Sequence, residues 1–176
     1  RARCMSAMGD AGGAINELNR FRNDGNLMKS DVAPQALVRL SELMVRHGRA
    51  VDAVVMLDKA RKDYEPQLAK DPKRAQWIPA LRYQHGMALK ESGKSREALA
   101  LFDSIIKEFK DRPEAAESSL ASIQVRKDET LSKLRAARQA VAAVPLDKPV
   151  DLKLLANEAE ATKQVTEIAN ALGEQK

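Results

Sequence analysis

The chain has 176 residues, which is enough for one ordinary domain or for several small repeats stacked end to end. Its composition is 44% hydrophobic and 31% charged but only 3% aromatic, a bias that is typical of long helices and disfavours a sheet. A net charge of +5 can attract an acidic partner weakly, whereas so few aromatic rings leave little for the stacking of nucleic-acid bases.

Three segments of the chain repeat one pattern around Gly9, Gly48 and Gly93. An alanine stands five residues after each glycine, a large apolar residue nine after, and a further apolar residue twelve after. These offsets differ by four and three residues, so the three positions share one face of a helix. The matching residues are Ala14, Leu18 and Phe21 in the first segment, Ala53, Leu57 and Ala60 in the second, and Ala98, Phe102 and Ile105 in the third.

The pattern continues on the other side of each glycine. Met5, Met44 and Leu89 stand four residues before it, and a small residue stands seven before it. Each segment therefore predicts a helix, a glycine turn that accepts a positive φ, and a second helix that approaches closely through its alanine. One such hairpin cannot cover its own apolar face, so the hairpins must stack. We predict an all-α helical-repeat solenoid.

This pattern resembles the tetratricopeptide repeat, most clearly in residues 34–66 and 79–113. The glycines lie 39 and 45 residues apart, where the family period is about 34. We assign the extra length before the third unit to an inserted turn in "EPQLAKDPKRAQWIP". The predicted division is a truncated first unit (1–33), a second unit (34–66), a third unit with the insertion (67–113) and a C-terminal helical hairpin or cap (114–176).

The tail departs from the repeat. Apolar positions continue from Leu120 to Val144 without a glycine, which predicts one helix of some thirty residues, ended by the proline-containing turn at residues 144–150. A last helix follows. We expect the two helices to form an antiparallel hairpin that caps the third unit. The alternative is a coiled-coil arm through which the chain self-associates into a homo-oligomer.

The resemblance implies a function in protein binding. In this family the first helices of successive units line a concave groove that holds a peptide or a partner's helix. The residues of this chain that would line it are Val38, Arg39, Glu42 and Arg46 in the second unit and Tyr83, Gln84, Met87, Lys90 and Glu91 in the third.

The three cations in that set, Arg39, Arg46 and Lys90, favour an acidic peptide or a C-terminal carboxylate as the ligand. The paired asparagines of the family's carboxylate clamp are missing here. The single tryptophan, Trp77, has two interpretations: it anchors a ligand, or it packs the inserted turn onto the repeats.

The sequence contains no arrangement that indicates catalysis, a cofactor or a metal. The single Cys4 has no second thiol to pair with, and the two histidines, His47 and His85, lie far apart in the sequence. We place His47 beside a helix end and leave His85 open between the core and the groove. We therefore predict a non-enzymatic scaffold for protein–protein interaction.

Two expectations concern the setting of the chain. "FDSIIKEFKDRPEAAES" is similar to repeats of bacterial cell-envelope proteins, which favours the periplasm or envelope over the cytoplasm. No apolar run is long enough to span a bilayer. Because the chain opens at Arg1 without a helix-start signal, we expect it to be a piece of a longer or processed protein.

Overall fold

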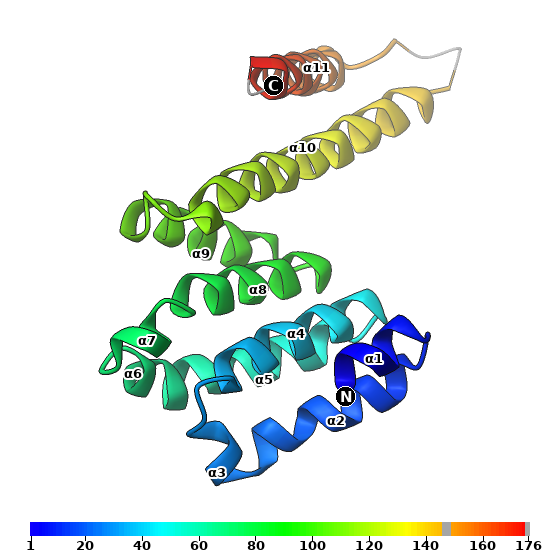
Figure 1. Ribbon diagram of the computed structural model, residues 1–176. Coiled ribbons are helices and arrows are strands. Elements are labelled where there is room, and N and C mark those ends of the chain that lie inside the picture. The colour runs from blue at the N-terminus through cyan, green and yellow to red at the C-terminus, as the bar shows by residue number, and fades with distance from the viewer. Residues whose placement is uncertain (146–148, 175–176) are drawn as a thin grey trace. The chain divides into compact units, whose positions relative to one another are not determined.

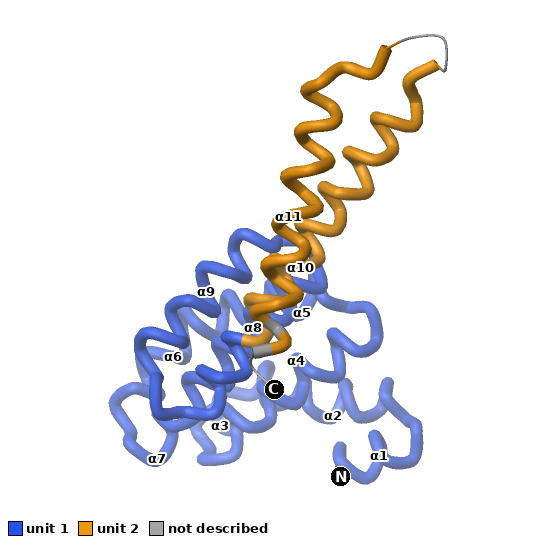
Figure 2. Tube along the Cα trace, turned by 90° about the horizontal axis from the view of Figure 1, so that it is seen from above, with its two compact units in different colours: residues 1–119 blue, residues 120–176 orange. Residues whose placement is uncertain are grey.

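The computed structural model describes residues 1–145 and 149–174, and every regular element in these ranges is a helix (Figure 1). The chain divides into two compact units, residues 1–119 and residues 120–176 (Figure 2). The all-α class expected from the sequence is confirmed. The boundaries predicted for the individual repeats stay a prediction.

Three helical hairpins make up most of the first unit. Each consists of two helices joined by a turn of two or three residues that contains one of the aligned glycines. The pairs are α1 (Ala2–Ala7) with α2 (Ala11–Asn23), α4 (Ala33–Arg46) with α5 (Ala50–Lys59), and α8 (Ile78–Glu91) with α9 (Ser95–Glu108).

The three glycine turns have the same backbone geometry. Gly9, Gly48 and Gly93 have φ of 83°, 72° and 82°, and no other residue of the described ranges has a positive φ. The residue after each glycine donates its N–H to the carbonyl five residues earlier, at 2.9, 2.8 and 2.9 Å. This closure satisfies a carbonyl that the end of the first helix would otherwise leave unpaired.

The aligned alanines occupy equivalent places. Ala14, Ala53 and Ala98 are each the fourth residue of the second helix of a hairpin, and each is 0% exposed. In the third hairpin a Cβ at Gly86 would overlap the ring of the fully buried Phe102. A small residue on one helix thus makes room for a large one on the next, as the pattern of the sequence predicts.

Short elements connect the hairpins: α3 (Gly25–Met28), the π-helical turn η1 (Ala60–Tyr64), α6 (Glu65–Leu68) and α7 (Pro72–Ala75). The side chain of Asp71 accepts from the N–H of Lys73 and so caps α7. Arg74 donates to the carbonyl of Met28 at 3.0 Å and to the hydroxyl of Tyr64 at 2.6 Å, and lies over that ring. The segment that the sequence indicates as an insertion is therefore tied to both neighbouring hairpins.

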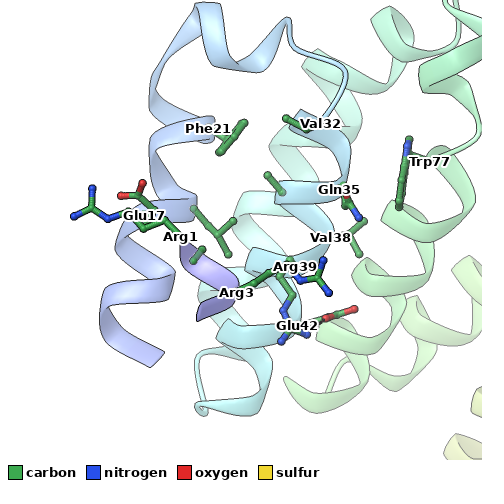
Figure 3. A pocket seen from close by; sticks show the side chains of 13 residues that line it. Arg1, Arg3, Glu17, Phe21, Val32, Gln35, Val38, Arg39, Glu42 and Trp77 are labelled. Atoms are coloured by element: carbon green, nitrogen blue, oxygen red, sulfur yellow. Dashed lines mark hydrogen bonds and ion pairs between the residues drawn. The ribbon is translucent and has the colours of Figure 1, made fainter. Parts of the chain in front are cut away.

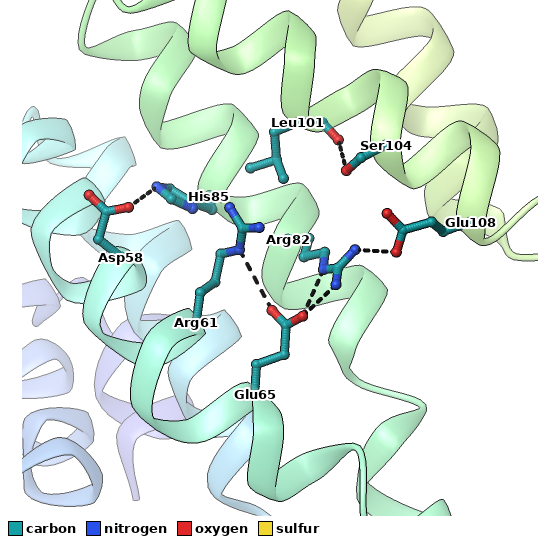
Figure 4. A network of polar contacts seen from close by, with 8 residues as sticks. All are labelled: Asp58, Arg61, Glu65, Arg82, His85, Leu101, Ser104 and Glu108. Carbon is teal, nitrogen blue, oxygen red and sulfur yellow. Dashed lines mark hydrogen bonds and ion pairs between the residues drawn. The ribbon is translucent and has the colours of Figure 1, made fainter.

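A second arginine joins three helices (Figure 4). Arg82 of α8 donates to Glu65 of α6 at 2.5 Å and to Glu108 of α9 at 2.6 Å. The side chains of Arg82 and Glu65 are only 16% and 15% exposed, so the bonds between them are shielded from water and bidentate.

His85 lies in the core between α5 and α8, which decides between the two positions left open by the sequence. It is 2% exposed, and its Nε2 lies 3.4 Å from Oδ1 of Asp58 on α5. Burial lowers the pKa of His85, and the carboxylate of Asp58 opposes that shift in part. The imidazole is therefore held mainly in its neutral form at neutral pH.

The tail contains the long helix α10 (Pro113–Ala142, 30 residues) and α11 (Leu152–Glu174). The expectation of a long helix is confirmed. The predicted turn at residues 144–150 falls partly outside the described residues. Within the second unit Arg138 of α10 donates to Glu158 of α11 at 3.2 Å. None of the described helices is long and apolar enough to cross a membrane.

Candidate functional site

The largest hollow of the first unit is a groove of about 770 Å³ between α1, α2 and α4, with Trp77 beside it at the start of α8 (Figure 3). Three of the predicted groove residues, Val38, Arg39 and Glu42, line it. They project from the face of α4 that is turned away from the core, because Leu37, Leu40 and Met44 on the other faces are at most 1% exposed.

One end of the groove is apolar. Phe21 of α2, Val32 beside α4 and Trp77 all line it, and Val32 remains 54% exposed (Figure 3). The structure places Trp77 at the groove, where its partly exposed ring is available to a ligand. Exposed apolar surface in a concavity is the feature that most often marks a docking site.

The sequence reasoning did not single out Phe21 or Val32 as groove residues. A signal for Val32 exists, since Val32 and Trp77 each stand sixteen residues before the glycine of their hairpin. Both residues occupy the position just before the first helix of their unit, where the side chain reaches across to the preceding unit. Phe21 has its signal in the repeat pattern, but that pattern predicts a core position.

The other end of the groove is polar. Arg39 donates to Glu42 at 2.7 Å, and Gln84 of α8 donates to the second oxygen of Glu42 at 3.4 Å. This chain of bonds crosses from α4 to α8 and joins three predicted residues. Because the side chains of Arg39 and Glu42 are 37% and 28% exposed, they remain in contact with water and with any ligand.

These contacts make the groove less basic than its cations alone imply. Arg39 is neutralised by Glu42, and the Nζ of Lys90 lies 3.5 Å from a carboxylate oxygen of Glu91. Arg46 is exposed and has no ion-pair partner within the part of the chain that the structure describes. A ligand therefore meets paired charges at Arg39 and Lys90, and an unpaired charge only at Arg46 among these three.

Tyr83 and Met87 lie further along α8 and do not line this groove. The ring of Tyr83 lies 6.0 Å from that of Phe102. Burial raises the pKa of the Tyr83 phenol, and the carboxylate of Glu117 adds to the rise. Arg46, Lys90 and Glu91 likewise lie outside the lining. The structure thus brings four of the nine predicted residues together, namely Val38, Arg39, Glu42 and Gln84.

The groove offers apolar contact, hydrogen bonds and paired charges. No group of three or more His, Cys, Asp or Glu in the described ranges is arranged to hold a metal ion. Cys4 is exposed, and His47 lies exposed at the C-terminal end of α4. Such a surface can recognise a polypeptide by shape and hydrogen bonding.

Comparison with known proteins adds one finding. Residues 80–112, which comprise most of α8 and all of α9, match the family model of the tetratricopeptide repeat. Repeats of this family generally mediate protein–protein interaction and are typically non-catalytic. No curated protein and no solved structure matches the chain.

Proposed function

We propose that the chain is a non-enzymatic protein-binding scaffold whose groove between α1, α2 and α4 holds a segment of a partner protein. The observation that carries this proposal is the juxtaposition of two surfaces in the groove. Exposed apolar side chains, Phe21, Val32 and Trp77, lie at one end, and the bonded chain of Arg39, Glu42 and Gln84 lies towards the other. An apolar contact surrounded by polar groups is the usual composition of a protein interface.

The nine residues implied by the family divide into two proposed roles. Val38, Arg39, Glu42 and Gln84 contact the partner directly within the groove. The residues further along α4 and α8 form an outer rim: Arg46, Tyr83, Met87, Lys90 and Glu91. Because rim contacts remain wet, they tune partner choice more than affinity.

An acidic segment or a C-terminal carboxylate remains the proposed ligand. Arg46 can receive a carboxylate directly, whereas Arg39 must first release Glu42. Glu42→Gln removes that competition, so it should strengthen the binding of an acidic partner. A partner that binds Glu42→Gln and the unchanged chain equally well would contradict the acidic ligand while leaving the groove in place.

The proposal is tested by capturing partners from a lysate of the source cell. Trp77→Ala and Arg39→Glu should each lower recovery of the captured protein about tenfold or more, the loss expected when a central contact worth about 1.4 kcal/mol is removed. Val51→Glu is the matched control, since Val51 is an apolar residue of α5 that is 65% exposed and does not line the groove. Equal recovery by all variants would mean that the partner binds elsewhere.

Self-association through the C-terminal hairpin is the second candidate. It is favoured by two exposed leucines on α11, Leu152 at 80% and Leu155 at 43%. Light scattering at tens of micromolar should give a mass above 19.4 kDa for the unchanged chain and the monomer mass for Leu155→Glu. A monomer in both cases would rule out this function.

A role in the bacterial cell envelope is a further proposal. It is supported by the similarity of residues 102–118 to repeats of envelope proteins. Fractionation of the source cell should recover the protein with the periplasm or membranes, and recovery in the cytoplasm would contradict it.

A further inference from the structure

The first hairpin differs from the other two in the length of its first helix. α4 and α8 have 14 residues each, whereas α1 has 6. α4 and α8 begin fifteen residues before their glycine and α1 begins seven before. About two helical turns that precede the corresponding point in the other hairpins therefore have no counterpart beside α2.

The consequence is visible in the residues that those turns would cover. Ile105 of α9 and Phe21 of α2 stand at the same offset from their glycines. Ile105 is 0% exposed, whereas Phe21 is partly exposed and lines the groove. Val32, on the facing side, is 54% exposed. The apolar end of the groove thus lies where the leading turns of a full-length first helix would be.

We infer that this end of the groove receives an amphipathic helical segment of a partner protein, about two turns long, in the place of the missing turns of α1. The inference rests on the proposed function and specifies the partner's conformation. The occupant that fits repeats the buried face of the leading turns of α4, where Ala33 and Leu37, four residues apart, are 0% and 1% exposed.

The walls of the groove favour a helix over an extended peptide. They are helices whose backbone N–H and C=O groups are bonded within each helix, so they offer an extended strand few backbone partners. A helical occupant satisfies its own backbone and presents only side chains. Its C-terminal end would approach Arg3, which lies towards the end of the groove away from Phe21, and an acidic last turn would suit that end (Figure 3).

The test joins such a helix to the chain, because two isolated turns are not stable in water. The probe is a seven-residue extension before Arg1 that copies residues 33–39, APQALVR, in the register that α4 has relative to its glycine. The matched control, APQLAVR, exchanges one alanine and one leucine and so turns the leucine by about 100° away from the groove. The only tryptophan, Trp77, lines the groove, so its emission reports occupancy without a label.

The copied extension should shift the emission of Trp77 to shorter wavelength and raise the unfolding midpoint by roughly 3 °C or more, and the control should do neither. It should also abolish capture of the partner that the unextended chain binds, while the control extension leaves capture intact. Equal behaviour of the two extensions, or no change in Trp77 emission with either, would overturn the inference. These results are separable from the proposed function, because the emission needs no partner, whereas failure of the unextended chain to capture any protein contradicts the proposed function itself.

Discussion

The contact between Gly86 and Phe102 gives the sharpest test of the repeat geometry. A Cβ on residue 86 would overlap the phenyl ring, and that ring is 0% exposed and cannot swing into solvent. The second hairpin solves the same problem with another pair. Ser41 and Leu57 stand at the same offsets from their glycine, and both are 0% exposed. The two pairs should therefore be exchangeable only as pairs.

The magnitudes follow from the structure. Gly86→Ser overfills the core at a cost of about 2 kcal/mol, less about 0.5 kcal/mol regained because serine is the better helix former. Phe102→Leu alone leaves a cavity and costs about 1.5–2 kcal/mol. In the double variant the serine occupies the space that the ring vacates. Its hydroxyl can donate to the carbonyl three residues earlier, as Ser41 donates to Val38 at 2.7 Å.

The free energy of unfolding, measured by urea titration of the chain and the three variants, decides the matter. The double variant should be destabilised by about 1–2 kcal/mol less than the sum of the two single changes. A sum that holds to within about 0.5 kcal/mol would refute the claim that the small residue is present to admit the large one. The m-value should stay constant, since a change would indicate that the folded or unfolded state has itself altered.

Three further predictions concern the turns, the insertion and the buried histidine. Gly48→Ala should lower the free energy of unfolding by about 1–2 kcal/mol, because its φ is +72°, whereas Gly25→Ala, at a site with open space and no positive φ, should not; urea titration compares the two. Arg74→Ala should speed hydrogen exchange in α7 and at Tyr64 and leave exchange in α9 unchanged. Because the pKa of His85 in the folded chain lies below its unfolded value of about 6.5, stability should be full above that pH and fall as the pH drops below it; His85→Leu should remove this part of the pH dependence of the urea midpoint.

Much of the fold could be predicted because it depends on local chemistry. A positive φ selects glycine, and a close crossing of two helices selects alanine, so both leave a mark on the sequence at a fixed offset. Gly48 and Ala53 show this, and the structure gives each the conformation and burial that its offset implies. The insertion was also recognisable, since Asp71 followed by proline is a helix start in almost any context.

The candidate site was harder to predict, because its chemistry depends on distance in space. The sequence presents Arg39 as a free cation, but its partner Glu42 stands one helical turn away and removes most of its charge from a ligand's view. The apolar end is assembled from three different segments, and Phe21 follows the pattern of a core residue. Its exposure results from a property that no single residue carries, the shortness of α1.

The same reasoning explains why binding should concentrate at one end of the repeat array. In a stack of hairpins each unit covers the next, so an interior unit has little apolar surface left to offer a partner. Ile105, in the third hairpin, is fully covered, and Phe21, at the same position of the first, is not. A partner helix at Phe21 would therefore gain the packing that the fold itself provides elsewhere. The groove is consequently both a binding surface and the point at which the array can be extended, and the copied helical extension separates a site with that shape from a merely apolar patch.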